Sequence, residues 1–477
     1  MNTASAVLRD IDELPGPRGM PVVGNLLQIE LGRIHQILEK WAHEFGRYFR
    51  FELGGHHFLV VADHEVIGAV LRDRPDGFRR TVRLQNVAQE MGLGPGLFGA
   101  EGEAWRHQRR MVMAGFDPAH IRDYFPALMK VTHRLHGRWQ KAARAGVAIG
   151  LQPDLMRFTV DAIAGLAFGA DVNTLESDED VIQRHLDKIF PALFKRGMSA
   201  LPWWRFVRLP ADRQLDRSVA AVNLAIDGFI AQARERMRID PSLREHPRNL
   251  LEAMIAAADL GGSGVSDREV AGNVMTMLLA GEDTTANSLA WMICLLRRNP
   301  QTLQRAQDEV RRVAGDPAGY SLEQMGALQY VEACAHETMR LKPVAPVLIL
   351  QALRDTVIAD VRVPTDTVIW CLMRHDSLDE RHFPDPAAFK PERWLGDGGP
   401  SQAANSAKRV SMPFGAGPRL CPGRNLALLE MKMAMAMLLG RFEIESVETP
   451  DGGDAQEHLS FTMAPLGLRM RLRELAA

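Results

Sequence analysis

The sequence predicts a mainly α-helical chain with a minor β-rich part, an α+β fold built around one long central helix. Apolar residues recur with helical spacing over most of residues 103–341 and again over 424–441. Strand-like runs occur only at about 47–62, 347–373 and 442–472, towards the two ends of the chain. Because such distant segments have to share one β-rich region, we expect the whole chain to form a single domain.

The composition narrows the class of protein. With 477 residues, 46% of them hydrophobic and 24% charged, the chain is typical of a globular protein with a large core. Its 57 basic and 59 acidic side chains nearly cancel, so we expect no nucleic-acid partner. The four cysteines include no C-x-x-C pair, which argues against a disulfide scaffold or a structural zinc site. Met1 to Leu14 lacks the apolar core of a signal peptide, and no apolar run approaches the ~18 residues of a membrane span. These features predict a cytoplasmic protein.

The first elements follow from local signals. Helical spacing runs from His35 to Phe45. The next two apolar runs, Tyr48 to Leu53 and His57 to Val61, flank the pair Gly54-Gly55. Paired glycines accept the positive φ angles of a tight turn, so this segment predicts a β-hairpin.

The second half begins with the long helix. Ser266 and Glu269 have the spacing of a capping box, and the helix is expected to end near Arg298, before Pro300. Five later elements are expected, in chain order: a helix at 322–341, strands at 347–352, 357–358 and 368–373, and a helix at 424–439. Residues 376–413 show little periodicity, and so long an irregular stretch suggests a functional role.

Cys421 differs from the other cysteines in its surroundings. Cys294, Cys334 and Cys371 lie in apolar patterns typical of inert buried thiols. Cys421 lies in a Gly/Pro loop directly before an apolar helix, where free N–H groups, such as that of Gly423, favour a thiolate. A thiolate there could serve as a nucleophile, a redox thiol or an axial ligand to iron, and spacing alone does not decide among these roles.

The long helix carries a polar turn, Ala280 to Thr285, between apolar stretches. A buried polar turn is costly unless it has a purpose. A threonine hydroxyl can bond the carbonyl one turn back, which opens a helix locally. Two further patterns, Glu337 to Arg340 and Trp105 to Arg109, would by themselves indicate a surface ion pair and a basic surface helix.

Taken together, these motifs make the chain similar to the cytochrome P-450 family. Phe414, Gly415, Gly417, Arg419, Cys421 and Gly423 match its F-x-x-G-x-R-x-C-x-G signature at every fixed position. The resemblance implies a haem b cofactor with the long helix over it and Cys421 as the thiolate ligand of the iron. It further implies that Phe414 shields the sulfur, that Arg419 pairs with a haem propionate, and that Gly423 lets the cofactor lie close.

The other motifs gain roles from the same resemblance. Ala280 to Thr285 resembles A-G-x-D/E-T, which implies that Asp283 and Thr284 relay protons to dioxygen and that Ala280 borders the haem. Trp105 and Arg109 resemble a W-x-x-x-R pair that binds a propionate. The remaining implied set is a structural triad that locks the cysteine loop, formed by Glu337, Arg340 and Arg393.

Two positions depart from the family pattern. Many members carry a basic propionate partner where this chain has Leu350, so that contact is in doubt. Asp366 stands where a glycine often follows a proline turn. Two other arginines, Arg106 and Arg110, are expected to form a local basic patch for an acidic electron donor.

The resemblance implies a monooxygenase that activates dioxygen and hydroxylates or epoxidises an apolar small molecule such as a fatty acid, terpenoid or polyketide. Candidate pocket residues, assigned by matching family segments, are Phe98, Ala280, Ala345, Val347 and Phe461. Since no flavin or nucleotide fingerprint follows the haem motifs, we expect electrons from a separate ferredoxin or flavodoxin with an NAD(P)H reductase. The alternatives are a peroxide-dependent peroxygenase and a haem sensor or carrier of the same fold.

Overall fold

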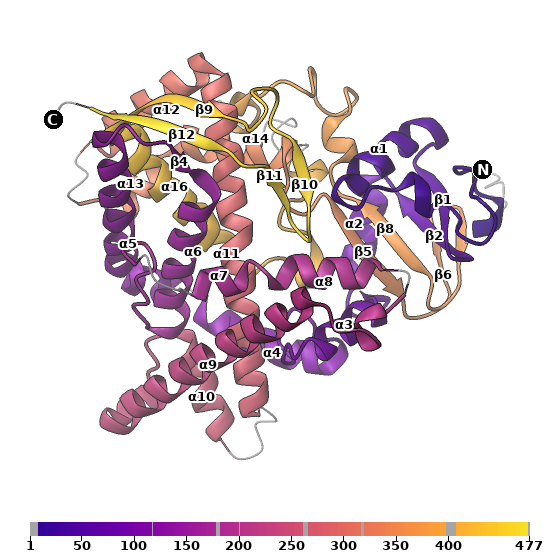
Figure 1. Cartoon of the computed structure of the whole chain (residues 1–477), viewed down its shortest axis with the longest axis horizontal. Helices are drawn as coiled ribbons and strands as arrows, with labels where there is room; N and C mark the ends of the chain where they lie inside the picture. Colours follow the sequence, from indigo (N-terminus) through magenta and orange to yellow (C-terminus); the bar gives the residue numbers. More distant parts are fainter. Residues whose placement is uncertain are drawn as a thin grey trace, which may run out of the picture.

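Strands from both ends of the chain form one five-stranded sheet, seen at the right of Figure 1. In spatial order the strands are β1 (Tyr48–Leu53), β2 (His56–Val61), β8 (Val368–Leu372), β5 (Val347–Ala352) and β3 (Phe78–Arg80). Only β2 and β8 pair in parallel, with Leu59 opposite Ile369. Gly54 and Gly55 have φ of 57° and 78° in the β1–β2 turn, so the predicted hairpin is confirmed.

The computed structural model describes most of the chain. The described ranges are 8–116, 118–177, 182–199, 201–260, 266–315, 319–396 and 407–475. Residues 397–406 of the irregular stretch expected at 376–413 therefore lie outside the described part, as do residues 1–7.

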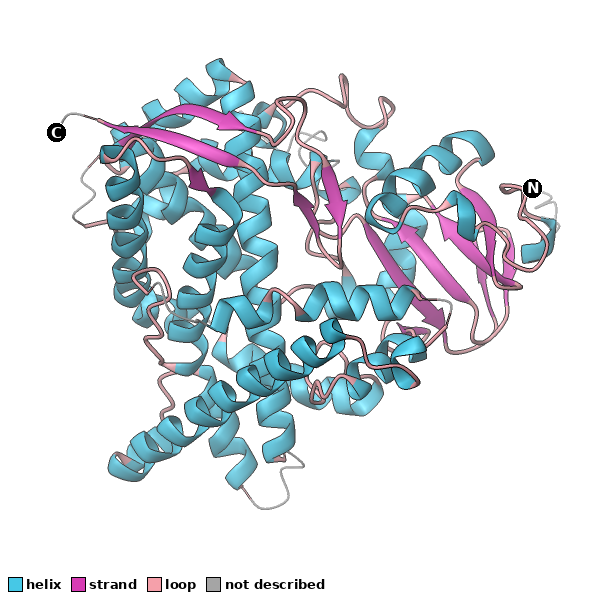
Figure 2. Ribbon diagram, in the orientation of Figure 1, coloured by secondary structure: helices cyan, strands magenta, loops and turns pink. Residues whose placement is uncertain are grey.

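Helices account for most of the rest, which confirms the predicted fold class (Figure 2). Those near the sheet are α1 (Ile34–Phe45), α2 (His64–Arg72) and α3 (Val82–Glu90). The larger helical part begins with α4 (Gly102–Gly115), α5 (Pro118–Arg144), α6 (Leu151–Phe168), α7 (Ile182–Leu186), α8 (Ile189–Met198), α9 (Pro210–Ile239) and α10 (Leu250–Asp259). It continues with α11 (Asp267–Arg298), α12 (Pro300–Val313), α13 (Leu322–Ala327), α14 (Gln329–Leu341) and α16 (Arg424–Arg441).

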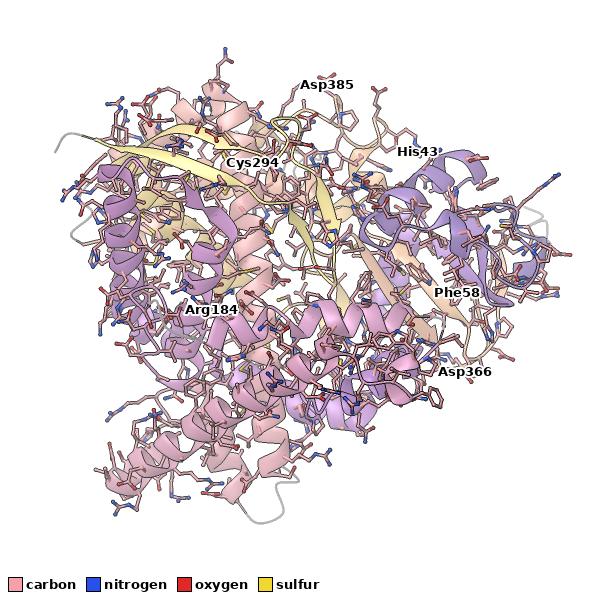
Figure 3. All side chains as sticks on the ribbon, in the orientation of Figure 1. His43, Phe58, Arg184, Cys294, Asp366 and Asp385 are labelled. Carbon is pink, nitrogen blue, oxygen red and sulfur yellow. The ribbon has the colours of Figure 1, made fainter. Side chains whose placement is uncertain are left out.

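The long helix α11 runs through the middle of the helical part and contacts α6, α10, α14 and α16 (Figure 1). Its predicted capping box is present, with the Ser266 hydroxyl accepting from the Glu269 amide and the Glu269 carboxylate accepting from the Ser266 amide. Burial on several sides is typical of a helix that positions side chains inside a core rather than at the surface. Figure 3 shows Cys294 of α11 inside this part and Phe58 on the distant sheet.

Short strands complete the structure. A three-stranded sheet has the order β4 (Ile149–Gly150), β12 (Arg469–Glu474), β9 (Phe442–Glu448). Two hairpins pair β10 (Glu457–Leu459) with β11 (Met463–Pro465), and β6 (Thr356–Ile358) with β7 (Val361–Val363). Among the described residues, no helix is both long and apolar enough to cross a bilayer.

Some predicted boundaries are wrong. The helix expected at 322–341 is two helices, α13 and α14, separated at Leu328. A new capping box at Ser321 starts the first, and Leu328 at φ −78° and ψ 69° interrupts the helical backbone before the second. At Asp366 the turn keeps the left-handed backbone that a glycine would take, with φ 66°.

Candidate functional site

Cys421 lies in a tight loop that leads into α16. The Cys421 amide donates to the Phe414 carbonyl at 3.0 Å, which closes the loop between the two residues. Cys421, Phe414 and Gly423 are all partly accessible, although α16 beyond them is largely buried. The loop therefore places a partly accessible cysteine at the start of a buried helix, whereas Cys294, Cys334 and Cys371 are buried.

The loop is seated on the end of α2. Gly417 has φ 68°, and a Cβ built on it would lie 2.6 Å from the Leu71 carbonyl oxygen and 2.7 Å from the Arg72 Cα. Glycine is therefore required here both by backbone conformation and by space. This contact fixes the position of the cysteine loop relative to the end of α2.

Two backbone amides, those of Gly423 and Arg424, hydrogen-bond to the Cys421 sulfur, as the sequence predicts. Burial nevertheless raises the pKa of the free Cys421 thiol, and the amides and the charge of Arg109 only oppose this rise. The amides therefore favour the thiolate, as the sequence predicts, but burial outweighs them in the free thiol. Metal binding requires a deprotonated sulfur, so a cation at the sulfur is what would stabilise the thiolate.

Trp105, Arg109 and Arg419 come together beside the cysteine loop. Arg109 donates to the Leu420 carbonyl at 2.7 Å. The Arg419 guanidinium lies 5.0 Å from the centre of the Trp105 ring and donates to both carboxylate oxygens of Glu101 at 2.7 Å. The three residues predicted to bind propionates thus converge, and Glu101 is an acidic partner that sequence reasoning missed.

Two more arginines, also missed from the sequence, reach this cluster. Arg74 is 4% exposed, and its Nε and Nη2 atoms are buried with no hydrogen-bond partner. Burial, followed by the nearby charge of Arg419, lowers the pKa of Arg74 to about 10. Arg80 donates to the Phe98 carbonyl at 2.6 Å, and burial, then the charges of Arg74 and Arg419, lower its pKa too.

Arg80 supplies a basic group near Leu350, the position at which the sequence departs from the expected pattern. Leu350 is buried, with 0% exposure, and makes no polar contact at the position where a basic residue is often found. Arg80 is its partner across the β3–β5 pairing, so the guanidinium comes from the neighbouring strand. A sequence signal existed in the adjacent pair Arg79-Arg80, but the strand that carries it is only three residues long.

This donor set fits haem b. Three guanidinium groups, from Arg74, Arg80 and Arg419, lie near the carboxylate of Glu101, and a fourth, from Arg109, lies near Arg419 and Cys421. This leaves unbalanced positive charge and unpaired buried N–H groups on Arg74. Buried donors without partners are rare unless something satisfies them. A cofactor with two carboxylates and a metal that takes a thiolate matches both the charges and the sulfur.

The face of α11 towards this region is accessible at one point. Ala280 is exposed although the six residues before it are nearly all buried. Thr284 donates to the Ala280 carbonyl at 2.8 Å, the bond one turn back that the sequence predicts. Asp283 points elsewhere: its carboxylate accepts from Asn287 at 2.7 Å and, through a short hydrogen bond, from the Thr462 hydroxyl.

Two buried or partly buried acids lie on α11, and a third, on α16, lies beside it. Burial raises the pKa of Asp283, although hydrogen bonds from Thr462 and Asn287 oppose it. Burial and the charge of Asp187 raise the pKa of Glu282, which is 2% exposed. Burial also raises the pKa of Glu430 on α16 to about 8, opposed by a hydrogen bond with Thr285. Sequence reasoning found only Asp283 among these.

Glu337, Arg340 and Arg393 meet as predicted. Arg340 is bidentate to Glu337, at 2.7 and 2.8 Å, with both side chains at 0% exposure, and Arg393 donates to Glu337 at 3.3 Å. Trp394 adds an unpredicted hydrogen bond to Glu337 at 2.9 Å. Arg340 also donates to the carbonyls of Ser377 (2.6 Å), Pro386 (2.8 Å) and Ala388 (3.2 Å). These bonds hold residues 377–394, upstream of the cysteine loop.

Only two of the five predicted pocket residues are in ring contact. Phe98 and Phe461 lie 5.8 Å apart between ring centres. Phe190 of α8 stacks on Phe461 at 4.4 Å and was missed, because nothing in its sequence neighbourhood marks it. Of the other predicted pocket residues, Val347 is the first residue of β5 and Ala345 lies two residues before it. Ala345 is exposed and Val347 is partly accessible.

The predicted basic patch is partly neutralised. Arg106 forms short ion pairs with Glu103 and Asp76. Arg110 is exposed. The prediction that Arg106 contributes a free positive charge to this patch is therefore wrong, because Glu103 and Asp76 compensate its charge.

Comparisons with known proteins agree with this geometry. The family model described as Cytochrome P450 matches residues 14–472. The crystal structure of the cytochrome P450DA heme domain superposes with a TM-score of 0.83 over 98% of this chain and 99% of that one, at 24% identity.

Curated relatives are of two kinds. Protein LUTEIN DEFICIENT 5, chloroplastic, of Arabidopsis thaliana is 27% identical over 84% of this chain and 68% of its own length. Carotene epsilon-monooxygenase, chloroplastic, of the same plant is 28% identical over 87% and 78%. A self-sufficient cytochrome P450 monooxygenase of Penicillium expansum is 27% identical over 97% of this chain, which spans only 43% of that relative.

Proposed function

The chain belongs to the cytochrome P450 family, and from that premise we propose that it is a haem-thiolate monooxygenase acting on an apolar small molecule. As a member of this family it is a haem-dependent oxidoreductase with haem b as its cofactor. When bound, haem b supplies the redox-active iron that reduces dioxygen and delivers one oxygen atom to a C–H bond or double bond. The observation that most supports the proposal is the cysteine loop beside a cluster of unbalanced arginines.

In this proposal Cys421 holds the iron through its sulfur. The amides of Gly423 and Arg424 hydrogen-bond to the sulfur and temper its charge, which is how neighbours tune a metal ligand. Phe414 closes the loop through its carbonyl and shields the sulfur from one side. Trp105, Arg109 and Arg419 bind the carboxylates of the cofactor.

Asp283 and Thr284 manage protons. A carboxyl group whose pKa is raised can both hold and release a proton near neutral pH, and burial raises the pKa of Asp283. Thr462 and Asn287 fix the orientation of the Asp283 carboxyl through hydrogen bonds. The Thr284 hydroxyl, anchored on the Ala280 carbonyl, faces the accessible side of α11.

The substrate we propose is a fatty acid, terpenoid, polyketide or similar apolar compound. The tilted and stacked rings of Phe98, Phe190 and Phe461 offer an aromatic wall, and Ala345 and Val347 add apolar surface. Such a wall binds by burial of apolar area and sets orientation by shape.

We propose a separate ferredoxin or flavodoxin with its reductase as the electron source. The 477 residues match a haem domain over nearly their whole length, so electrons have to reach this domain from another one. The relatives that are self-sufficient make a fused donor the competing arrangement. Turnover of the purified chain with added ferredoxin and reductase, against the chain alone, separates the two. We also propose a cytoplasmic location, for which cell fractionation is the test.

The function is tested by reconstitution. With a donor system, NAD(P)H and dioxygen, we expect consumption of both together with an oxidised product from an apolar substrate panel. Product formed only with added peroxide would favour the peroxygenase, and reversible ligand binding without product would favour a sensor or carrier.

Two variants test the assigned residues. Cys421→Ser should abolish the thiolate-type, red-shifted Soret band of the reduced carbon-monoxide adduct. Thr284→Ala should release peroxide in place of product. Thr276→Ala is the matched control, because Thr276 donates to the Gly272 carbonyl at 2.8 Å in the same way two turns earlier. Equal coupling in both threonine variants would contradict the relay.

A further inference from the structure

Two histidines and an aspartate meet away from the cysteine loop, where α2 begins beside the segment that follows β8. The side-chain ligand atoms of His64, Asp376 and His382 all lie within 4.8 Å of one another. Asp376 Oδ2 is 2.7 Å from His64 Nδ1 and 3.8 Å from His382 Nε2. The two imidazole rings lie 4.7 Å apart between centres, with planes at 79°.

These separations suit a tetrahedral divalent ion. Zinc binds histidine nitrogen and carboxylate oxygen at about 2.0–2.2 Å, so two ligand atoms on one ion lie roughly 3.3 Å apart. The two measured distances to Asp376 Oδ2 bracket that value. Small side-chain rotations would bring all three atoms onto one ion.

An unpaired donor points to the same place. His382 Nε2 is buried and has no hydrogen-bond partner, although its nearest acceptor is Asp376. A buried polar atom left unpaired costs free energy unless something satisfies it. Side-chain exposures of 12% for His64 and 21% for His382 leave a way in for an ion and room for water on it.

One carboxylate, that of Asp376, brings negative charge to the cluster, and its side chain is only 3% exposed. A carboxylate beside two imidazoles is a donor set that suits zinc. Arg47, the nearest fixed positive charge, pairs with Asp63 at 2.6 Å and also lies 3.6 Å from Asp376 Oδ1, which leaves Oδ2 to face the two imidazoles.

We propose that His64 Nδ1, Asp376 Oδ2 and His382 Nε2 form a binding site for a divalent transition-metal ion of the Zn²⁺ class, with water completing the coordination. The proton that His64 Nδ1 now shares with Asp376 moves to the other ring nitrogen or to solvent when the ion binds. Cysteine spacing, which argues against a structural zinc site, carries no information about a site built from two histidines and an aspartate.

Such an ion would fasten the β-rich part to the segment that the Glu337 and Arg340 pair holds. His64 is the first residue of α2, while Asp376 directly precedes Ser377, whose carbonyl accepts from Arg340. The ion would join both in one coordination sphere. The expected role is structural, and it does not depend on the proposed oxidation.

The test uses the haem-loaded protein, stripped of loosely held metal with a chelator and dialysed against Zn²⁺ alone. We expect one zinc per chain by elemental analysis, and zinc-edge X-ray absorption with two imidazole ligands. Added Zn²⁺ should raise the melting temperature. His64→Ala and His382→Ala should each lose the zinc and the rise in melting temperature, while His246→Ala, at an exposed loop position, should keep both.

An unchanged zinc content in both variants, or no stoichiometric zinc in the parent protein, would overturn the site. The Soret spectrum shows whether each variant has folded around its haem. If His382→Ala fails that check, His382→Gln keeps a polar side chain of similar length and gives the same comparison.

Discussion

Arg80 lies directly opposite Leu350 in the antiparallel pairing of β3 with β5. Directly opposed residues on neighbouring strands extend on the same side of a sheet, with Cβ atoms about 5 Å apart. The Arg80 side chain therefore starts one strand away from Leu350, the position where many family members carry a basic residue. In this chain the positive charge at this point of the sheet is carried by β3 instead of β5.

We predict that Arg80→Leu weakens haem retention. Removing one of the guanidinium groups around Glu101 reduces the positive charge available to the cofactor carboxylates. Haem transfer to apomyoglobin should be faster by about tenfold, the equivalent of ~1.4 kcal/mol. Arg83→Leu is the control, because Arg83 on α3 donates outwards to the Gly197 carbonyl.

The pairing of Arg80 with Leu350 suggests a second experiment. Introducing Leu350→Arg into the Arg80→Leu variant should recover part of the lost retention, because the new guanidinium starts from the opposed position. Retention that stays low in the double variant, or that never fell in Arg80→Leu, would remove Arg80 from the cofactor site.

Gly417→Ala should loosen the cysteine loop. The added Cβ would lie 2.6 Å from the Leu71 carbonyl oxygen, and alanine is also strained in a left-handed backbone with φ 68°. Gly415→Ala is strained only by its φ of 76°, since nothing lies within 4 Å of the added carbon. The backbone cost is about 1–2 kcal/mol in both. The melting temperature and the Soret intensity should therefore fall further in Gly417→Ala. Equal losses in the two variants would show that the close contact of Gly417 with α2 does not stabilise the loop.

Glu430 should make stability depend on pH. Its pKa is raised by burial from 4.5 to about 8, so the folded chain keeps a proton that the unfolded chain has already released. The free energy of unfolding therefore falls as pH rises from about 4.5 to about 8, by up to ~1.4 kcal/mol per pH unit from this group. Glu430→Gln should remove that slope.

Melting temperatures measured across this range check the prediction. The gap between Glu430→Gln and the parent should open with rising pH in favour of the variant. Glu448→Gln at the exposed end of β9 is the control and should leave the slope unchanged. Parallel curves for parent and Glu430→Gln would show that the carboxyl is not protonated in the folded chain.

Arg340→Lys should be severely destabilising although it keeps the charge. Lysine cannot reproduce the planar fork that binds both oxygens of Glu337 and three backbone carbonyls. Glu337 would keep hydrogen bonds from Arg393, Trp394 and the Lys390 amide, but it would lose the bidentate pair in a fully buried place, and breaking a buried ion pair costs about 3–5 kcal/mol. Arg381→Lys, at an exposed pair with Asp379, should cost less than 1 kcal/mol. Chemical denaturation of both variants measures the difference.

Much of the fold is predictable because its signals are local. The capping box at Ser266 and the glycine pair in the first hairpin act within a few residues, and both predictions are confirmed. β3 is different, because three residues carry no periodicity and the strand exists only through its pairing with β5. The break at Leu328 likewise depends on backbone angles that apolar spacing does not report.

The candidate site divides along the same line. Residues inside a compact motif, such as Cys421 and Arg419, can be found from spacing. Glu101, Arg74 and Arg80 join the site only because the chain folds back on itself, so no sequence spacing marks them. The pairing of Arg106 with Asp76 shows the converse, since a free charge in the sequence is compensated in the structure.

The parallel pairing of β2 with β8 joins two strands that are synthesised at very different times. Leu59 leaves the ribosome long before its partner Ile369, and elongation at about 5–20 residues per second makes the interval roughly 15–60 s. Throughout that time the inner edge of β2 has backbone groups without their final partners. One edge of the first hairpin therefore lacks its native partner, and is exposed to non-native pairing, until β8 has been made.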